Sequence, residues 1–281
     1  MRFVMTAVLW LATTVALAVA VPAAWAQINV INADGYAAQA QKAAGDPALQ
    51  SAVAAELTTR AMALIAAHGG ARYAVDGSEV HDAASAFTAG PSFPPLFAEA
   101  NRAAHDWLFT GAGSGDSWVV DVAPMLKDGS FQQILSRYNV TVPANLTVSV
   151  PLASQPLRQG QLSRLATWGP RVSIGAAALS GLCALLTLAA ARRRGKALTS
   201  LGISALLVGA AGWAGIEVGG RYVLDALNRT TGDIRGIAEV MVGHAEASLR
   251  QWLDWTLVAG VGLVVFGVLV AMLGSLFKRS P

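Results

Sequence analysis

The chain has 281 residues, of which 54% are hydrophobic and 13% are charged, and its mean hydropathy is +0.49. Because soluble proteins carry about 25% charged residues, this composition excludes an ordinary soluble protein and indicates a membrane protein with room for one modest soluble domain. The net charge of +3 and the pI near 9.3 also fit a nucleic-acid-binding protein, so the positions of the charges have to decide between the two classes.

The first element is an apolar segment at residues 1–26, which we predict to be a transmembrane helix or signal anchor. Phe3–Ala26 is long enough to cross a hydrocarbon core of ~30 Å, and Trp10 and Trp25 would then lie near its two interfaces. The sequence Ala-Trp-Ala at positions 24–26 also fits the small-x-small pattern of a cleaved signal peptide, so cleavage stays an open alternative. In both cases the residues that follow are expected outside the cytoplasm.

The expected fold class is a mainly α membrane protein with four transmembrane helices. Residues 27–170 are expected to form an extracytoplasmic α+β domain, mostly helical, between spans 1 and 2. Asp46-Pro47 is typical of a helix start, and apolar residues follow it at helical spacing. A second helix is predicted from Pro94 to Leu108. Two short valine-rich runs are predicted to be strands with a helix between them; the strands are Trp118–Val122 and Leu146–Val150, and the helix lies around Phe131–Tyr138.

Residues 171–216 are predicted to be a transmembrane hairpin. Its two arms, 172–191 and 197–216, contain no Asp, Glu, Lys or Arg. Each arm has the length that a helix rising ~1.5 Å per residue needs to cross a bilayer. The turn between the arms is basic and is expected in the cytoplasm.

The positive charges gather at the predicted cytoplasmic pieces of the chain. These pieces hold seven Lys/Arg and no acid, whereas the rest of the chain holds 13 Lys/Arg and 17 Asp/Glu. This is the positive-inside bias of membrane topology, so the basic pI does not indicate nucleic acid and no nucleic-acid partner is expected. The residues expected to set the topology are Arg192, Arg193, Arg194, Lys196, Lys278 and Arg279, together with Arg2.

Residues 217–254 are predicted to be an extracytoplasmic helical hairpin that turns at residues 228–232. An apolar stripe in this segment is too long to leave in water, so we expect it to pack on the 27–170 domain. The stripe consists of Ile234, Ile237, Met241, Ala245, Leu249 and Leu253.

The last span and a short cytoplasmic tail are predicted in residues 255–281. Three glycines recur in this span at every seventh residue: Gly260, Gly267 and Gly274. A face of small residues lets another helix approach closely, although glycine is also common in membrane helices in general.

Four stretches of the chain carry a family resemblance. They are AWAQINVINADGY at 24–36, DPALQSAV at 46–53, FAEANRAAH at 97–105 and VVDVAP at 119–124. In these stretches the chain resembles a group of actinobacterial (mycobacterial-type) integral membrane proteins of uncharacterised function, from which it departs by having no charged residue directly after the first span. The resemblance implies an inner-membrane protein that faces the cell envelope, and it assigns no catalytic residue.

Candidate reactive residues are few, and none has a motif around it. The histidines show no metal-binding spacing and the serines lack a GxSxG context, so no metal or cofactor is expected. These residues are His68, His81, His105 and His244, and Ser114, Ser117 and Ser130.

One polar cluster is the best candidate site. Asn101 and His105 are one helical turn apart, Arg102 lies beside them, and Asp121 follows in the next predicted strand. Such a cluster is more typical of side chains that hold the following loop than of a binding cleft, and both interpretations stay open.

Two classes of function remain. The first is a non-enzymatic protein of the plasma membrane whose outer domain binds a partner protein, lipid or wall component, with the bilayer and a membrane protein or a second copy as partners. The second is a membrane-bound enzyme or an accessory subunit of an envelope transport complex. Transport by this chain alone is not expected, because ion-coupled transporters carry ionisable residues near the middle of their spans and none of these spans does.

Overall fold

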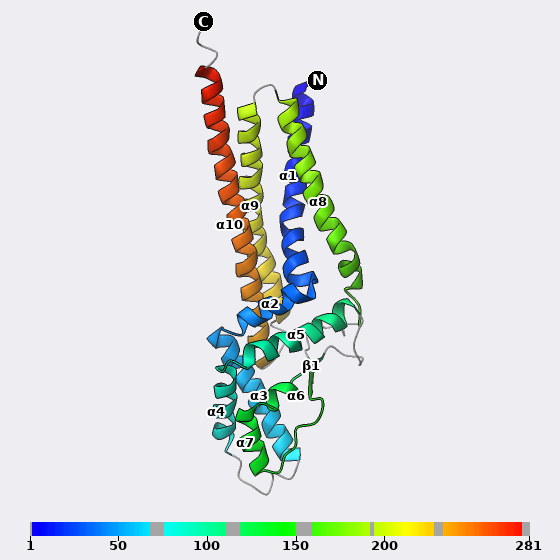
Figure 1. The fold of residues 1–281 in the computed structure, drawn as a ribbon, viewed down its shortest axis with the longest axis vertical. Helices are drawn as coiled ribbons and strands as arrows, with labels where there is room; N and C mark the ends of the chain where they lie inside the picture. The colour runs from blue at the N-terminus through cyan, green and yellow to red at the C-terminus, as the bar shows by residue number, and fades with distance from the viewer. Residues whose placement is uncertain are drawn as a thin grey trace. The chain divides into compact units, whose positions relative to one another are not determined.

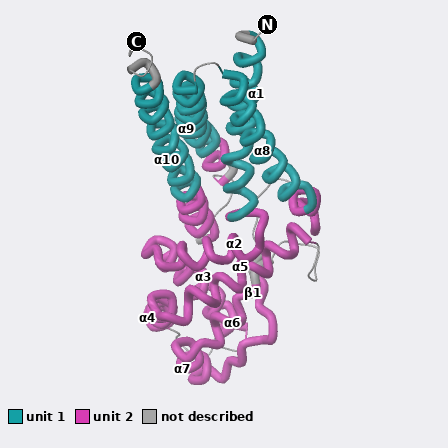
Figure 2. Tube along the Cα trace, turned by 45° about the horizontal axis from the view of Figure 1, so that its top comes forward, with its two compact units in different colours: residues 1–28, 167–221, 246–281 teal, residues 29–166, 222–245 magenta. Residues whose placement is uncertain are grey.

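The computed structural model describes residues 2–67, 76–110, 119–149, 159–191, 194–227 and 233–276, and they form two units (Figure 1). Unit 1, teal in Figure 2, comprises Met1–Ile28, Thr167–Arg221 and Glu246–Pro281. Unit 2, magenta in the same figure, comprises Asn29–Ala166 and Tyr222–Ala245. Both units are therefore assembled from segments that are distant in the sequence.

Four helices in the described part of the chain are long and apolar enough to cross a membrane. Large apolar side chains on these helices point outward, as in Ile174, Leu185 and Met272, which are 69%, 66% and 59% exposed. Such side chains are stable only in an apolar surrounding, so the chain is a multi-pass membrane protein, as predicted. The helices are α1 (Arg2–Ala26), α8 (Ser163–Ala190), α9 (Arg194–Leu227) and α10 (Asp233–Leu276).

The last two helices run well beyond the apolar segments that identified them. Helix α9 continues to Leu227, and α10 is unbroken from Asp233 into the last apolar run. The predicted turn at residues 228–232 lies outside the described residues.

Unit 2 is built mainly from helices whose starts are marked in the sequence. The side chains of Asn32, Asp76 and Asp128 accept hydrogen bonds from backbone amides and begin three of them, while prolines stand in the first turn of three others. The helices are α2 (Ala33–Ala43), α3 (Pro47–Ala67), α4 (Gly77–Thr88), α5 (Phe93–Phe109), α6 (Ala123–Leu126) and α7 (Gly129–Arg137), and the π-helix η1 (Gln27–Ile31) precedes them.

The predicted α+β class of this domain is wrong, because its architecture is helical. The only extended pairing among the described residues is between β1 (Val119–Asp121) and β2 (Thr147–Ser149), two antiparallel strands with Val120 opposite Val148. Two strands of three residues cannot form a stable sheet layer by themselves. The alanine-rich helices instead bury their small faces against one another and supply the core.

The core of unit 2 is aromatic and aliphatic. The Phe87 ring meets Phe93 and Phe131 edge-on, with centroids 5.7 and 5.9 Å apart, and all three are almost fully buried. The N-terminal part of α10 packs against this core through Ile234, Ile237, Val240 and Met241. The predicted packing of the stripe is therefore confirmed for Ile234, Ile237 and Met241, whereas Leu249 and Leu253 of the same predicted stripe belong to unit 1.

Candidate functional site

The polar residues of α5 make separate contacts. The Asn101 side-chain amide donates to the Phe97 carbonyl in its own helix, at 2.8 Å. Arg102 forms an ion pair with Asp34 of α2 and lies 3.9 Å from a Glu99 carboxylate oxygen. The carboxylate of Asp34 raises the pKa of the Arg102 guanidinium. Both polar groups are therefore engaged in holding helices, Asn101 within α5 and Arg102 between α5 and α2.

His105 is buried and connects α5 to the segment before α2. Its Nε2 donates to the Val30 carbonyl at 3.0 Å, because a carbonyl oxygen can only accept. The ring stacks on Phe109 with centroids 4.2 Å apart and lies 5.3 Å from the Tyr36 ring, whose phenol has its pKa raised by burial. A histidine held between two aromatic rings by a backbone bond has a structural role that needs no substrate.

The Asp121 carboxylate accepts two hydrogen bonds next to the short strand pair. One of its carboxylate oxygens accepts hydrogen bonds from the Ala123 and Leu146 amides, both at 2.9 Å. These bonds join the first residue of α6 to the segment just before β2. The four residues predicted as a polar cluster thus have four different sets of partners.

The remaining histidines lie apart from one another. His81 Nδ1 is 3.3 Å from the Thr58 hydroxyl, and His244 Nε2 is 3.1 Å from a carboxylate oxygen of Asp46. Within the described ranges there is no group of three His, Cys, Asp or Glu residues that could hold a metal ion. Of the other candidates, the Ser130 amide bonds to Asp128, while His68, Ser114 and Ser117 lie outside the described residues.

Helices α9 and α10 lie side by side (Figure 1), and two of the three predicted glycines, Gly260 and Gly267, lie against α9. A Cβ added at Gly267 would be 2.6 Å from the Thr199 amide nitrogen, and one added at Gly260 would be 3.0 Å from the Gly202 carbonyl oxygen. The structure describes Gly274 as part of α10 but does not describe its contacts. The matching glycines of α9, Gly195 and Gly202, were missed in the sequence, although they show the same spacing of seven.

Helices α1 and α9 are joined by polar contacts that the sequence did not reveal. The Trp10 indole donates to the Ser200 carbonyl at 2.9 Å, and the Thr14 hydroxyl donates to the Ser204 hydroxyl at 2.8 Å. Ser204 is fully buried. Hydroxyls of this kind are ordinary helix-to-helix links in an apolar surrounding.

A cavity of about 750 Å³ lies among the four long helices, within unit 1. Its wall is mostly apolar, and none of the described residues that line it is an acid or a base. The lining includes Thr13 and Leu17 of α1, Ala184 of α8, Leu201 of α9 and Trp252 of α10.

A second hollow, of about 450 Å³, lies on unit 2 where α7 ends. Helix α7 ends in a Schellman motif: Asn139 has a positive φ of 53°, and the Val140 amide bonds to the Leu135 carbonyl at 3.0 Å. Gln132, Ser136 and Asn139 are exposed around the hollow, and Leu135 and Val140 form its apolar floor. This is a surface of unit 2 that combines amide and hydroxyl groups with apolar contacts.

A cluster of four interacting side chains marks the end of the apolar part of α9 and α10. Arg250 bonds to Glu217 at 3.0 Å and lies 5.1 Å from the centre of the Trp213 ring, whose indole donates to Asp254 at 3.1 Å. At the opposite end of α9, Arg194 and Lys196 are exposed. The other predicted topology residues, Arg192, Arg193, Lys278 and Arg279, lie outside the described residues, as does the side chain of Arg2.

Comparison with known proteins gives no match, whether with protein-family models, with curated proteins or with solved structures. The resemblance to actinobacterial membrane proteins therefore stays a prediction from the four stretches that carry it. Any function has to be argued from the chain itself.

Proposed function

We propose that this chain is a non-enzymatic plasma-membrane protein of the cell envelope, with unit 2 outside the cytoplasm as a binding module for a partner protein, lipid or wall component. The single observation that carries the proposal is the hollow at the end of α7. Gln132 and Asn139 face it, and neither side chain makes a hydrogen bond with a described residue. Free amides beside an apolar floor are suited to binding a ligand.

The polar residues that would have favoured an enzyme are used in the fold. Asn101, Arg102, His105 and Asp121 hold backbone groups or neighbouring helices. A catalytic constellation requires such groups to converge on one reacting atom, and these four are engaged elsewhere. The engagement of these side chains in the fold favours a binding function over a catalytic one for unit 2.

The orientation follows from the distribution of charge. Arg194 and Lys196 lie at the start of α9, beside Arg192 and Arg193 in the sequence, and this end of the helix would stay in the cytoplasm by the positive-inside bias. Accordingly, the opposite end of α9, with Glu217, would emerge outside, and unit 2 with it.

Cysteine labelling tests the orientation in a Cys183→Ser background, which removes the one cysteine of the chain. Gln41→Cys, away from the hollow, should react with a membrane-impermeant maleimide in intact cells, and Arg194→Cys should react only after the membrane is permeabilised. Both positions are exposed, so access to the side chain does not limit the reaction. Labelling of Arg194→Cys in intact cells would refute the proposed orientation.

Photo-crosslinking tests the binding module in native membranes. A benzophenone residue at Ser136, beside the hollow, should give a specific adduct that the same residue at Gln41 does not give; both positions are exposed. Digestion of the adduct with protease, lipase or a wall hydrolase identifies its class. Changing Gln132 and Asn139 together to alanine should abolish the adduct; an adduct unaffected by that change would remove the hollow from the proposal.

A further inference from the structure

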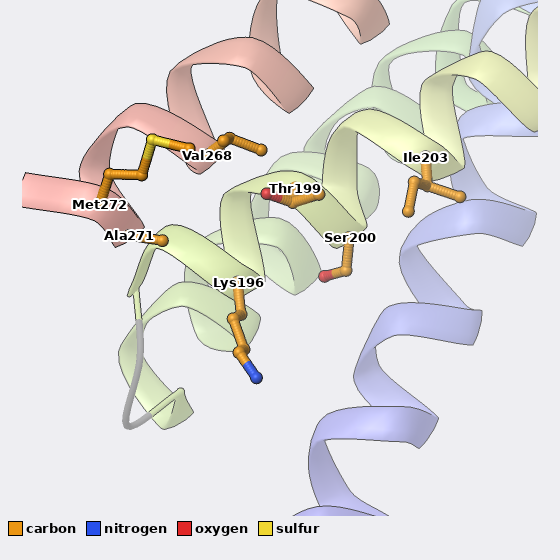
Figure 3. Close-up of a pocket in the computed structure, with 7 residues that line it drawn as sticks. All are labelled: Lys196, Thr199, Ser200, Ile203, Val268, Ala271 and Met272. Atoms are coloured by element: carbon orange, nitrogen blue, oxygen red, sulfur yellow. The ribbon is translucent and has the colours of Figure 1, made fainter. Parts of the chain in front are cut away.

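A pocket of about 410 Å³ lies between α9 and α10, at the end of the helices next to the basic turn (Figure 3). Lys196 is the third residue of α9, and Met272 is near the end of α10 at Leu276. Ile203 and Val268 line the pocket further along the helices. It therefore extends from the end of the helices into their apolar part, as a lipid does from its head group to its upper acyl chain.

The chemistry of the lining changes along the same direction. Ile203, Val268 and Met272 give an apolar wall, and each of them is more than one third exposed, so the wall is open to a ligand from the side. The hydroxyls of Thr199 and Ser200 donate to carbonyls of their own helix, at 3.1 and 2.8 Å, which leaves their oxygens free to accept a bond from a hydroxyl of a head group.

The charge at the mouth of the pocket has no counter-ion among the residues that the structure describes. Lys196 is exposed and makes no ion pair with any described residue, and no acid lines the pocket. The arginines of ordinary ion pairs in this chain behave differently: Arg60, Arg137 and Arg235 each bond to a glutamate. An unpaired ammonium beside an apolar wall is suited to binding an anion that carries an apolar chain.

We infer that this pocket, formed by Lys196, Thr199 and Ser200 with the wall of Ile203, Val268 and Met272, binds an anionic phospholipid. The phosphate would lie at the Lys196 ammonium, the head-group hydroxyls at Thr199 and Ser200, and one acyl chain along the wall. The neighbouring arginines of the sequence, Arg192 to Arg194, strengthen the attraction of the turn to anionic lipid. The inference does not depend on the side of the membrane on which the turn lies, nor on what unit 2 binds.

Native mass spectrometry of the full-length protein in detergent tests this, with phosphatidylglycerol and phosphatidylcholine as the added lipids. Phosphatidylglycerol should bind the wild type more tightly than phosphatidylcholine. Lys196→Gln should weaken phosphatidylglycerol binding about fivefold, the equivalent of ~1 kcal/mol for one basic group near an anionic lipid, and leave phosphatidylcholine unchanged. The matched control is Lys42→Gln, which removes an exposed lysine of unit 2 and should bind as the wild type does.

Two further arms separate the alternatives. Ala271→Leu, which fills the wall between the helices, should weaken phosphatidylglycerol binding, whereas soluble glycerol phosphate should not compete with the lipid. Full competition by glycerol phosphate would mean a phosphate site without a lipid chain, and the inference would be wrong. It would also be wrong if Lys196→Gln bound phosphatidylglycerol like the wild type, or if Ala271→Leu changed only the oligomeric state, which would make the pocket an interface between copies.

Discussion

The two units differ in where they place most of their large apolar side chains. Unit 2 encloses large rings and branched chains, with Phe87, Phe93 and Phe131 exposed by 2% or less. Unit 1 buries hydroxyls and small residues, such as Thr187 and Ser204 at 0%, and turns its large apolar side chains outward. The same kinds of residue thus serve as core in one unit and as surface in the other.

This difference follows from the solvent of each unit. In water, burial of a large apolar side chain is the main source of stability, so unit 2 gathers its phenylalanines inside. In lipid that gain disappears, because the acyl chains are as apolar as leucine, and helices associate through close backbone approach and hydrogen bonds. Substitutions in one unit should therefore follow rules that fail in the other.

The largest effect is expected from emptying the core of unit 2. Phe87→Ala leaves a void beside two other rings and should destabilise unit 2 by about 3–5 kcal/mol. Limited proteolysis of the detergent-solubilised protein should then cut within 29–166 while the long helices of unit 1 resist as in the wild type. The control is Asp82→Ala, on the exposed face of the same helix, which the protease should cut as it cuts the wild type.

A smaller effect is expected where α10 joins the core of unit 2. Met241→Asp puts a carboxylate against apolar side chains and should cost at least ~2 kcal/mol, because the charge has to be desolvated. New cleavage sites should appear in 29–166 as well as in 233–245, as measured by peptide mapping. Cleavage confined to 233–245 would mean that this part of α10 is not integral to the core.

In unit 1 the sensitive positions are glycines, which no rule for soluble cores would select. Gly267→Ala forces α9 and α10 apart at Thr199 and should cost about 1–3 kcal/mol. Gly262→Ala is the matched control on the same helix, because nothing lies within 4 Å of its added Cβ. Unfolding by sodium dodecyl sulfate in mixed micelles measures both. Because alanine has a higher helix propensity than glycine, a gain of stability in both variants would show that propensity, rather than contact with α9, controls this unit.

Polar contacts between spans should matter less. Thr14→Val removes the hydrogen bond to Ser204 with little change in volume and should cost ~0.6 kcal/mol, the average for such bonds in membranes. The same unfolding assay applies, and Thr14→Ser, which keeps the hydroxyl, should restore most of the loss. A loss of several kcal/mol would mean that the α1–α9 contact is the main support of unit 1.

The sequence revealed the long helices because lipid leaves few choices to the backbone. A run without charges has to be helical and has to be long, so the positions of all four spanning helices could be predicted. The close contact of Gly267 could be suspected from its spacing, and the same spacing at Gly195 and Gly202 marks the matching glycines of α9. Which of these glycines meet depends on the tertiary structure.

The helical domain was harder to predict, and its class was wrong. The runs around Val120 and Val148 have the composition of strands, yet only three residues of each pair, since Asp121 captures the Leu146 amide and the chain then enters α6. The prediction of a polar cluster relied on nearness in sequence. Asn101, Arg102 and His105 lie on one helix, but their side chains bond to different segments, and only the tertiary structure decides which.

The smallest effect is expected at the hydrogen-bonded contact of Asp46 and His244, which connects the start of α3 to α10 within unit 2. The Ala48 amide, and then the His244 side chain, lower the pKa of the Asp46 carboxyl below its usual value. The folded chain therefore binds a proton at this site less readily than the unfolded chain does. The stabilisation is present above the unfolded pKa of about 4 and is lost as the pH falls through the lower folded pKa.

Asp46→Asn isolates this charge, because an asparagine can still accept the bond from the Ala48 amide. Proteolytic resistance of unit 2 should be lower in the variant than in the wild type at pH 7, and the two should converge as the pH approaches 3. Asp82→Asn, which changes an exposed carboxylate without a hydrogen bond to a described residue, should show no such convergence. If the wild type and Asp46→Asn instead lose resistance in parallel from pH 7 to pH 3, the charge on Asp46 does not stabilise the contact, and the apolar residues of α10 alone hold it to unit 2.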